Sequence, residues 1–376
     1  MIDPKNFINT LKKNKINFVT GVPDSLYANL CNTFDKKIKK KHIVGSNEGN
    51  SVGLAIGYYL ATGKIPLVYL QNSGLGNILN PIISLTDKKV FSIPIFFLIG
   101  WRGEINNKGK QINDEPQHLT QGKITLKILK LLGIKYKILD KKQNYKKIVK
   151  ELCEYSKKKS APVAIIIRKN TFIKNIKNNK KITGNILSRE QALKIVFENI
   201  PKKVPKVSTT GMLSRELNEL NKIHKTENNT FMCIGGMGHA ISVASGIAFS
   251  RKKKVVCLDG DGAAIMHLGS LVNSSKNKNL IHILFNNNSH DSVGGQKTPS
   301  DKMSFCEIAK KIGYSNSYKA TNKLEIKKFL KLGFKKKASF FLEIKCVKGH
   351  RNNLIRPDKK IKNYKKSFMS FLKKVS

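Results

Sequence analysis

Acidic residues and arginines are scarce in this 376-residue chain. It carries 71 lysines and arginines against 24 aspartates and glutamates, a formal net charge of +47, yet only seven of its cations are arginine. Proteins that bind nucleic acids favour arginine and place aromatic residues among their cations. We therefore interpret the lysines, which are spread along nearly the whole chain, as a solvated surface and expect no nucleic-acid partner. The alternative is a dedicated nucleic-acid surface, because so large a positive charge attracts polyanions.

Long apolar runs and paired cysteines are also lacking. No apolar run reaches the roughly 18 residues that a membrane-spanning helix needs, and the N-terminal Met-Ile-Asp-Pro does not resemble a signal peptide. The six cysteines are scattered and show no Cys-x-x-Cys spacing. We therefore expect a cytoplasmic protein without a membrane partner, whose cysteines are buried thiols rather than disulfides or zinc ligands.

The sequence does contain two series of strand-like apolar runs. They are 16–20, 42–46, 65–71, 93–99, 135–139 and 162–167, then 206–210, 230–235, 254–259, 280–285, 315–319 and 339–347. The runs are continuous rather than alternating, which is typical of parallel sheets covered on both faces. We predict an α/β protein with two doubly wound parallel-sheet domains, residues 1–172 and 188–376, joined by a polar linker over 173–187.

Capping signals predict where several helices begin. Asp3 followed by Pro4 predicts an N-cap with proline at the first helical position. Ser188, with Gln191 three residues later, predicts a capping box at the start of the second domain. An apolar helix is expected over 49–61.

Lysine is absent from a few stretches that are rich in glycine, asparagine and serine. In one of these, Glu48 is the only charged residue between Val44 and Gly63, and 231–250 has no charged residue except histidine. A long cation is excluded where backbone is buried or where a ligand packs closely. Glycine-rich turns at the carboxyl ends of parallel strands also bind ligands. Because both halves contribute such stretches, we expect a site between two domains.

One turn of the second half offers the chemistry of a phosphate and metal site. An apolar run ends in Gly260-Asp261-Gly262, and we expect a helix from about Ala263. The glycines permit a tight turn and a close approach, and the helix N-terminus favours phosphate. A divalent cation can then bridge that phosphate and the carboxylate of Asp261. Asn287, at the end of the next apolar run, offers an amide oxygen to the same Mg²⁺ ion. The alternative is an ordinary turn and an ordinary loop.

This pair of motifs resembles the signature of thiamine-diphosphate (ThDP) enzymes, and longer segments resemble the phosphonopyruvate decarboxylase family in particular. Those segments are 20–26, 47–50, 58–64, 71–77, 100–104, 114–118, 211–217, 236–240 and 290–296. The resemblance runs from about Asn14 to Met369, and sulfopyruvate decarboxylases are similar relatives. The loop 105–113 is longer than is usual in the family.

The resemblance implies that 3-phosphonopyruvate is decarboxylated to 2-phosphonoacetaldehyde and CO₂, with ThDP and Mg²⁺ as cofactors, as a step toward 2-aminoethylphosphonate. It implies Glu48 as the catalytic carboxylate that protonates N1′ of the aminopyrimidine, and Asp261, Asn287 and the carbonyl of Ser289 as metal ligands. The plainer alternative for Glu48 is a solvated glutamate at a helix N-terminus.

The resemblance also implies the residues that contact the cofactor and the substrate. The expected cofactor contacts are Glu48, Met237, Gly238, His239, Gly260, Asp261, Gly262, Ala263 and Asn287. The expected substrate contacts are Asp24, Ser25, Arg102, His118, Gln121 and His290. Plainer alternatives are a core methionine for Met237, a helix cap for Asp24, a salt bridge for Arg102 and structural histidines for His118 and His290.

The family likeness has consequences for assembly and for rival activities. In ThDP enzymes the two ends of the cofactor are held by different subunits, so a homo-oligomer with active sites between subunits is implied. The rival activities are sulfopyruvate decarboxylation, decarboxylation of another 2-oxo acid, and carboligation. The sequence does not separate phosphonopyruvate from sulfopyruvate, because only the tetrahedral anion of the substrate differs.

Overall fold

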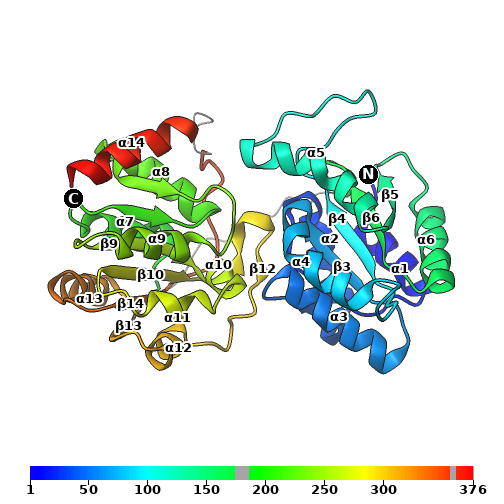
Figure 1. Cartoon of the computed structure of the whole chain (residues 1–376), viewed down its shortest axis with the longest axis horizontal. Coiled ribbons are helices and arrows are strands. Elements are labelled where there is room, and N and C mark those ends of the chain that lie inside the picture. Colours follow the sequence, from blue (N-terminus) through cyan, green and yellow to red (C-terminus); the bar gives the residue numbers. More distant parts are fainter. Residues whose placement is uncertain (174–185, 356–360, 376) are drawn as a thin grey trace. The chain divides into compact units, whose positions relative to one another are not determined.

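The computed structural model describes residues 1–173, 186–355 and 361–375. The chain divides into two compact units, Met1–Lys177 and Asn178–Ser376 (Figure 1). Most of the predicted linker, 173–187, lies outside the described residues. Over the described ranges, no helix is both long enough and apolar enough to cross a membrane.

Unit 1 is built on a six-stranded sheet in which all strands are parallel, in the order β2-β1-β3-β4-β6-β5. The strands are β1 (Val19–Gly21), β2 (His42–Val44), β3 (Leu67–Gln71), β4 (Phe96–Gly100), β5 (Lys135–Leu139) and β6 (Val163–Ile167). The helices are α1 (Pro4–Lys13), α2 (Ala28–Lys37), α3 (Glu48–Thr62), α4 (Leu75–Pro81), α5 (Pro116–Leu131) and α6 (Tyr145–Lys159). Short helical turns are η1 (Ser25–Tyr27), η2 (Lys39–Lys41), η3 (Asn72–Gly74) and η4 (Ile82–Thr86).

The central strands β3, β4 and β6 of unit 1 are buried on both faces, which explains their continuous apolar sequences. The prediction of a continuous apolar run is wrong for the edge strand β5, whose Lys135 and Lys137 are exposed. Leu67 and Tyr69 of β3 belong to a core cluster with residues of α1, α2 and α6. Val68 and Leu70, on the opposite face of the same strand, belong to a second cluster with residues of α3, α4 and α5. Successive side chains of a strand point to opposite faces, so a strand covered on both sides must be apolar at every position.

Unit 2 contains a second six-stranded parallel sheet, in the order β13-β14-β10-β9-β7-β8. The strands are β7 (Lys206–Ser208), β8 (Thr230–Met232), β9 (Val255–Gly260), β10 (Leu280–Asn286), β13 (Asn316–Ala320) and β14 (Phe340–Lys345), with a short antiparallel pair of β11 (Ser289–His290) and β12 (Gln296–Lys297). The helices are α7 (Arg189–Glu198), α8 (Met212–His224), α9 (Ala240–Phe249), α10 (Asp261–Met266), α11 (Ser270–Ser274), α12 (Phe305–Ile312), α13 (Lys323–Lys335) and α14 (Ile361–Lys374). The turns η5 (Glu227–Asn229) and η6 (Asp291–Val293) complete it.

The two units share one strand order. Counted from the first strand of each six-stranded sheet, both read 2-1-3-4-6-5 from edge to edge. In this order the chain changes direction between the first and third strands, which are β1 and β3 in unit 1 and β7 and β9 in unit 2. Ligands bind at the carboxyl ends of strands at such a switch point. The predicted class, two doubly wound α/β domains with six strands each, is confirmed.

Local predictions are confirmed in part. The Asp3 side chain caps α1, and Ser188 and Gln191 form a capping box on α7. The helix expected from about Ala263 starts two residues earlier, because Gly260 is the extended N-cap (φ −121°, ψ 153°) and Asp261 already lies in the first turn of α10. An acidic residue is favourable there, since the helix N-terminus carries a partial positive charge. The pair β11–β12 was not predicted.

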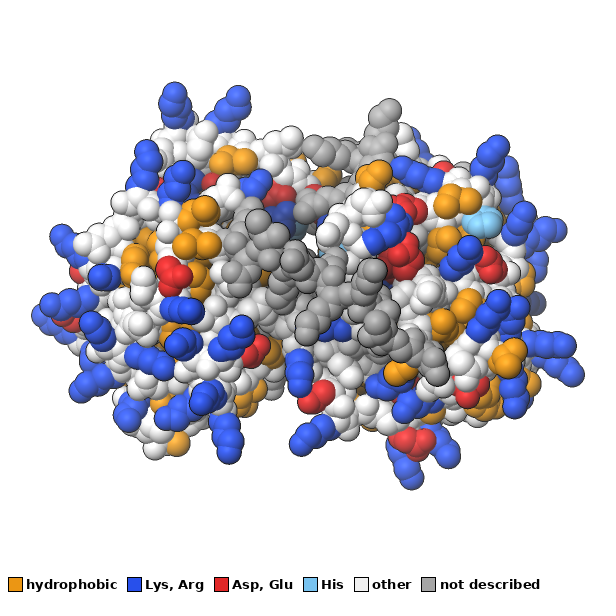
Figure 2. All heavy atoms as spheres, turned by 180° about the vertical axis from the view of Figure 1, so that it is seen from behind, with side chains coloured by type: hydrophobic (Ala, Val, Ile, Leu, Met, Phe, Trp, Pro, Cys, Tyr) orange, Lys and Arg blue, Asp and Glu red, His pale blue; other side chains and the backbone are white. Residues whose placement is uncertain are grey.

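The surface lysines and the cysteines can now be placed. In Figure 2, Lys and Arg side chains are spread over the visible face of both units instead of gathering in one patch. All six cysteines are free thiols, five of them buried, whereas Cys233 is only half-buried. The prediction of a buried thiol is therefore wrong for Cys233.

Candidate active site

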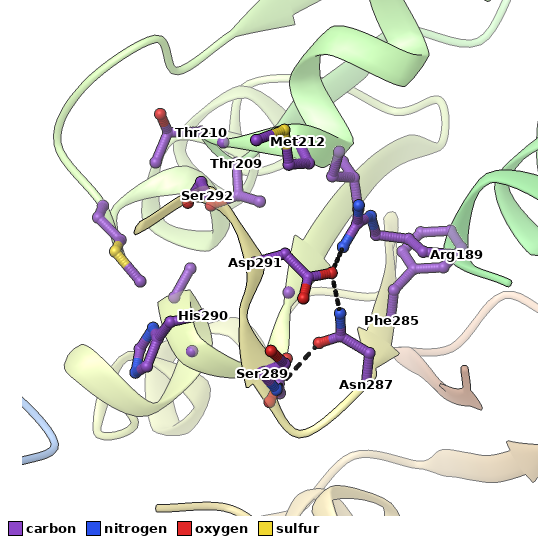
Figure 3. A pocket seen from close by; sticks show the side chains of 17 residues that line it. Arg189, Thr209, Thr210, Met212, Phe285, Asn287, Ser289, His290, Asp291 and Ser292 are labelled. Atoms are coloured by element: carbon purple, nitrogen blue, oxygen red, sulfur yellow. Dashed lines mark hydrogen bonds and ion pairs between the residues drawn. The ribbon is translucent and has the colours of Figure 1, made fainter. Parts of the chain in front are cut away.

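A pocket of unit 2 lies at the carboxyl ends of β7 and β9, which is the switch point of that sheet (Figure 3). Predicted residues that line it are Met237, Gly260, Asp261, Gly262, Ala263, Asn287, Ser289 and His290. Residues that line it without having been predicted are Arg189, Thr209, Thr210, Gly211, Met212, Leu213, Phe285, Asp291 and Ser292. The sequence therefore indicated residues of this pocket, but none of the lining residues 209–213 that follow β7.

Asp261 is buried at the start of α10, and two hydroxyl groups hold its carboxylate. Oδ2 accepts hydrogen bonds from Thr298 Oγ1 at 2.6 Å and from Ser300 Oγ at 3.0 Å. Burial raises the pKa of Asp261, while the hydrogen bonds from Thr298 and Ser300 act to lower it. Because both hydroxyls engage Oδ2, the carboxylate is oriented with Oδ1 clear of them. Neither Thr298 nor Ser300 was predicted from the sequence.

The amide of Asn287 is oriented by a buried charge network (Figure 3). Its Nδ2 donates to Asp291 Oδ2 at 2.6 Å, and the same oxygen accepts from Arg189 Nη1 at 2.7 Å. The amide oxygen of Asn287 accepts from the backbone N–H of Ser289 at 3.2 Å. With its nitrogen committed to Asp291, Asn287 turns its oxygen away from that carboxylate. Asp291 lies in the segment 290–296 that carried the family resemblance, so a signal for it was present.

The backbone at Gly262 has no room for a side chain. A Cβ at Gly262 would lie 2.8 Å from Nδ1 of His290 and 3.2 Å from Cγ2 of Thr298, so a larger residue would push the β11–β12 segment away. At Gly260, in contrast, a Cβ would meet nothing within 4 Å. Packing within the chain therefore requires a glycine at position 262 but not at position 260.

His290 and Ser289 bring unpartnered polar atoms to the pocket. His290 Nε2 and Ser289 Oγ are buried and, among the described residues, have no hydrogen-bond partner. Burial lowers the pKa of His290 to about 4, against an opposing effect of Asp291. A neutral imidazole and a hydroxyl that lack partners fit a pocket that receives a polar ligand.

Gly238 and His239 lie at the N-terminal end of α9 and do not line the pocket itself. Gly238 has φ +91°, and a Cβ there would lie 2.6 Å from the His267 ring. The His239 ring stacks on His267 with centroids 4.5 Å apart. Burial and, next, the neighbouring His239 lower the pKa of His267. The structure thus places both predicted residues against His267, which follows the C-terminal end of α10, whereas Asp261 begins that helix.

In unit 1, Glu48 is the first residue of α3 and is buried. Asn47 caps the helix through a hydrogen bond to the N–H of Asn50 (2.8 Å), and Glu48 is 5% exposed. Burial raises the pKa of Glu48, and a hydrogen bond from Asn77 acts in the opposite direction. A solvated glutamate at a helix N-terminus, the plainer alternative, is therefore wrong. A buried carboxyl group with a raised pKa is suited to proton exchange near neutral pH.

Asp24 occupies the switch point of unit 1, at the end of β1. Its Oδ1 accepts from the N–H of Leu26 at 3.1 Å, as a helix cap, and from Nε2 of Gln71 at 3.2 Å. Its Oδ2 is buried and has no partner in the described part of the chain. Burial raises the pKa of Asp24. The helix-cap alternative is thus observed, and it leaves one carboxyl oxygen uncommitted.

Arg102 lies after β4 and is held by Asp114. Its Nε and Nη2 donate to the two carboxylate oxygens at 2.8 and 2.5 Å, and Oδ1 of Asp114 also lies 3.2 Å from Nδ1 of His118. Burial acts to raise the pKa of Asp114, but these hydrogen bonds hold it well below its usual range. Arg102 Nη1 reaches toward the exposed Ser25 (Oγ at 3.5 Å). Asp114, which was not predicted, therefore joins the predicted Arg102 and His118, and Ser25 lies beside Arg102.

Gln121 follows His118 on α5, and its side chain is half-buried. Its Oε1 is buried and lacks a hydrogen-bond partner within the described ranges. His290, predicted with these residues as a substrate contact, instead lines the pocket of unit 2. The structure thus divides the predicted substrate contacts between the two units.

A second cluster of potential metal ligands lies within the sheet of unit 2. Ligand atoms of Cys257, Asp259 and His282 lie within 4.8 Å of one another, and all three residues are fully buried. Asp259 Oδ2 and His282 Nε2 are 3.4 Å apart. The cluster therefore places a carboxylate, an imidazole and a thiol side by side between β9 and β10 in the interior of unit 2.

The fold is an α/β architecture of two doubly wound sheets with a polar pocket at the switch point of the second sheet, and comparison with known families identifies its class. Residues 5–127 match the family model "Thiamine pyrophosphate enzyme, N-terminal TPP binding domain". Residues 209–344 match "Thiamine pyrophosphate enzyme, C-terminal TPP binding domain". The chain belongs to the thiamine pyrophosphate enzyme family.

Curated relatives refine this assignment. The chain is 30% identical to a phosphonopyruvate decarboxylase of Streptomyces viridochromogenes, over 81% of this chain and 78% of the relative. It is 29% identical to a phosphonopyruvate decarboxylase of Streptomyces hygroscopicus, over 84% and 80% respectively. It is also 28% identical to the beta subunit of a sulfopyruvate decarboxylase from Methanococcus maripaludis, over 50% of this chain and 99% of the subunit. The chain is thus a ThDP-dependent decarboxylase, a carboxy-lyase related to the phosphonopyruvate and sulfopyruvate enzymes.

Proposed function

We propose that this chain catalyses the ThDP- and Mg²⁺-dependent decarboxylation of 3-phosphonopyruvate to 2-phosphonoacetaldehyde and CO₂, as a step in phosphonate biosynthesis. The observation that carries the proposal is the pairing of two features. One is the pocket whose oxygens come from Asp261, Asn287 and Ser289, and the other is the buried carboxyl group of Glu48. The names of the two Streptomyces relatives support the substrate.

The residues of the pocket fit the diphosphate end of the cofactor. A carboxylate, an amide oxygen and a backbone carbonyl are the hard oxygen donors that Mg²⁺ prefers, and we assign them to Asp261, Asn287 and Ser289. Partners already orient two of these groups: Thr298 and Ser300 hold Asp261, and Asp291 holds Asn287. The remaining cofactor contacts in the proposal are Met237, Gly238, His239, Gly260, Gly262 and Ala263.

ThDP, when bound, supplies an electron sink for the loss of CO₂ from a 2-oxo acid. The part of this chain is to hold and move protons and to bind the acid. We propose that Glu48 exchanges a proton with N1′ of the aminopyrimidine. Burial raises the pKa of Glu48 and thereby favours the neutral carboxyl form that this exchange requires.

The polar cluster around Arg102 is proposed to receive the phosphonate. Two guanidinium nitrogens of Arg102 are bound to Asp114, and Nη1 faces Ser25, so one edge of the cation is left for an anion. Asp24, His118 and Gln121 complete the proposed substrate contacts of unit 1, and His290 is proposed to contribute from unit 2. We further propose a homo-oligomer with active sites between subunits, as in other enzymes of this family.

A comparison of two substrates tests the proposal. We expect CO₂ release from 3-phosphonopyruvate with a kcat/KM at least about tenfold above that for sulfopyruvate, a difference of about 1.4 kcal/mol in transition-state binding. Phosphonoacetaldehyde is identified by ³¹P NMR, and an added aldehyde reveals any carboligation. A preference for sulfopyruvate, or a carboligated main product, would replace the proposal with the corresponding alternative.

A further inference from the structure

Asn77 on α4 donates a side-chain hydrogen bond to the carboxyl group of Glu48. Its Nδ2 lies 2.6 Å from Glu48 Oε2. Glu48 is buried, whereas Asn77 is exposed on its own helix. The amide therefore reaches inward to a carboxyl group that has almost no access to water.

Two glycines create the space for this contact. A Cβ at Gly74 would lie 2.5 Å from Oε1 of Glu48 and 2.6 Å from its Cδ, so the backbone of η3 packs directly on the carboxyl group. A Cβ at Gly49 would lie 2.9 Å from the carbonyl oxygen of Asn77, so α3 and α4 also approach closely. The local backbone is thus built around the pair of side chains.

An amide N–H can donate only to an acceptor oxygen. While Asn77 Nδ2 donates to Oε2, protonation of Glu48 is favoured on Oε1, because a carbonyl oxygen accepts a hydrogen bond better than the hydroxyl oxygen of a protonated carboxyl group does. The contact therefore favours one oxygen as the carrier of the exchangeable proton and orients the carboxyl plane.

Among the described residues, no other ionisable side chain is a cause of the pKa shift of Glu48. The elements packed most extensively against α3 are β1, β3 and α4. They carry one ionisable side chain, Tyr69 of β3, whose hydroxyl group hydrogen-bonds to His42 at 2.8 Å, and α3 itself carries Tyr58 and Tyr59. The pKa of Glu48 is set by burial, which raises it, and by the Asn77 amide and the backbone N–H of Glu48 itself, which lower it.

We propose that Asn77 is a positioning residue for Glu48, whose amide holds Oε2 and so leaves Oε1 as the oxygen that exchanges a proton. This inference rests on the proposed role of Glu48 in the reaction. Asn77 is neither a proposed metal ligand nor a proposed substrate contact, so this role is separate from both.

The test compares Asn77→Ala and Asn77→Asp with wild type in the cofactor-free full-length chain. The Glu48 carboxyl group is titrated by ¹³C NMR, with its resonance assigned by its loss in Glu48→Gln. We expect its pKa to rise in Asn77→Ala, since the charged form loses a donor, and to rise further in Asn77→Asp, since a second acid faces it. In the loaded enzyme, kcat at neutral pH should fall on the order of tenfold, the size of a lost hydrogen bond to a charged group.

Asn80→Ala is the matched control, because Asn80 is an exposed asparagine on the same helix whose Oδ1 accepts from Ser84 (2.8 Å). It should leave both the titration and kcat unchanged. An unchanged or lowered pKa of Glu48 in Asn77→Ala overturns the inference on Asn77. If instead Glu48→Gln retains turnover, the proposed role of Glu48 itself fails, so the two failures are distinguishable.

Discussion

Glu48→Gln should slow decarboxylation by about 10²- to 10⁴-fold, the range that a positioned general acid or base contributes. Glutamine keeps the size of the side chain and can still accept a hydrogen bond, but it cannot exchange a proton. Because Glu48 is buried and is the only charged residue between Val44 and Gly63, no neighbouring carboxylate in that stretch can substitute for it. Steady-state kinetics with saturating ThDP measure the effect.

Cofactor binding supplies the control for Glu48→Gln. The ThDP dissociation constant of the variant should stay within a few-fold of wild type, because the proposed metal and diphosphate contacts lie in unit 2. The far-UV circular dichroism spectrum should also match. A variant that folds, binds ThDP and turns over at a near wild-type rate would show that Glu48 is not the catalytic carboxylate.

Arg189→Met should destabilise unit 2 by about 3–5 kcal/mol, since it strands two carboxylates in the interior. The guanidinium donates to both oxygens of Glu216 (2.8 and 2.9 Å) and to Asp291 at 2.7 Å, and all three side chains are buried. Removing Arg189 also releases Asp291, which orients the amide of Asn287. Calorimetric unfolding of the full-length chain measures the effect as a lower transition temperature for unit 2.

Arg351→Met is the matched control for this prediction. Arg351 likewise pairs with two carboxylates, Glu190 and Glu219. Glu190 directly follows Arg189 in the sequence, and Glu219 lies close to Glu216. Its side chain is 36% exposed, so solvent screens both ion pairs. An exposed pair contributes about 0–1 kcal/mol. Equal destabilisation by both variants would contradict a role for burial in the cost of losing Arg189.

The strands and the main polar turns could be predicted because each has a local signature. A run such as Val163–Ile167, apolar at every position, requires two covered faces. The turn at Asp261 follows such a run directly, so its place at a strand end could be inferred without knowledge of the fold. Glu48 was identifiable because it is an isolated charge in an apolar stretch.

The partners of these residues could not be predicted, because they come from distant loops without a periodic pattern. Thr298 and Ser300 reach Asp261 only through the β11–β12 pair, and two-residue strands leave no signal in the sequence. Asp114 reaches Arg102 across the loop 105–113. Side-chain orientation depends on such tertiary contacts, so the sequence indicated candidate site residues but not the groups that orient them.

A calorimetric titration of ThDP into the cofactor-free protein tests the central claim most directly, namely that Asp261, Asn287 and Ser289 hold the diphosphate through a divalent cation. With Mg²⁺ present we expect a saturable heat of binding. With EDTA in place of Mg²⁺, and separately in Asp261→Ala, the affinity should fall at least about 10- to 100-fold, as when the ligands or their partners in a metal site are lost. ThDP binding of the same affinity in all three titrations would contradict the account.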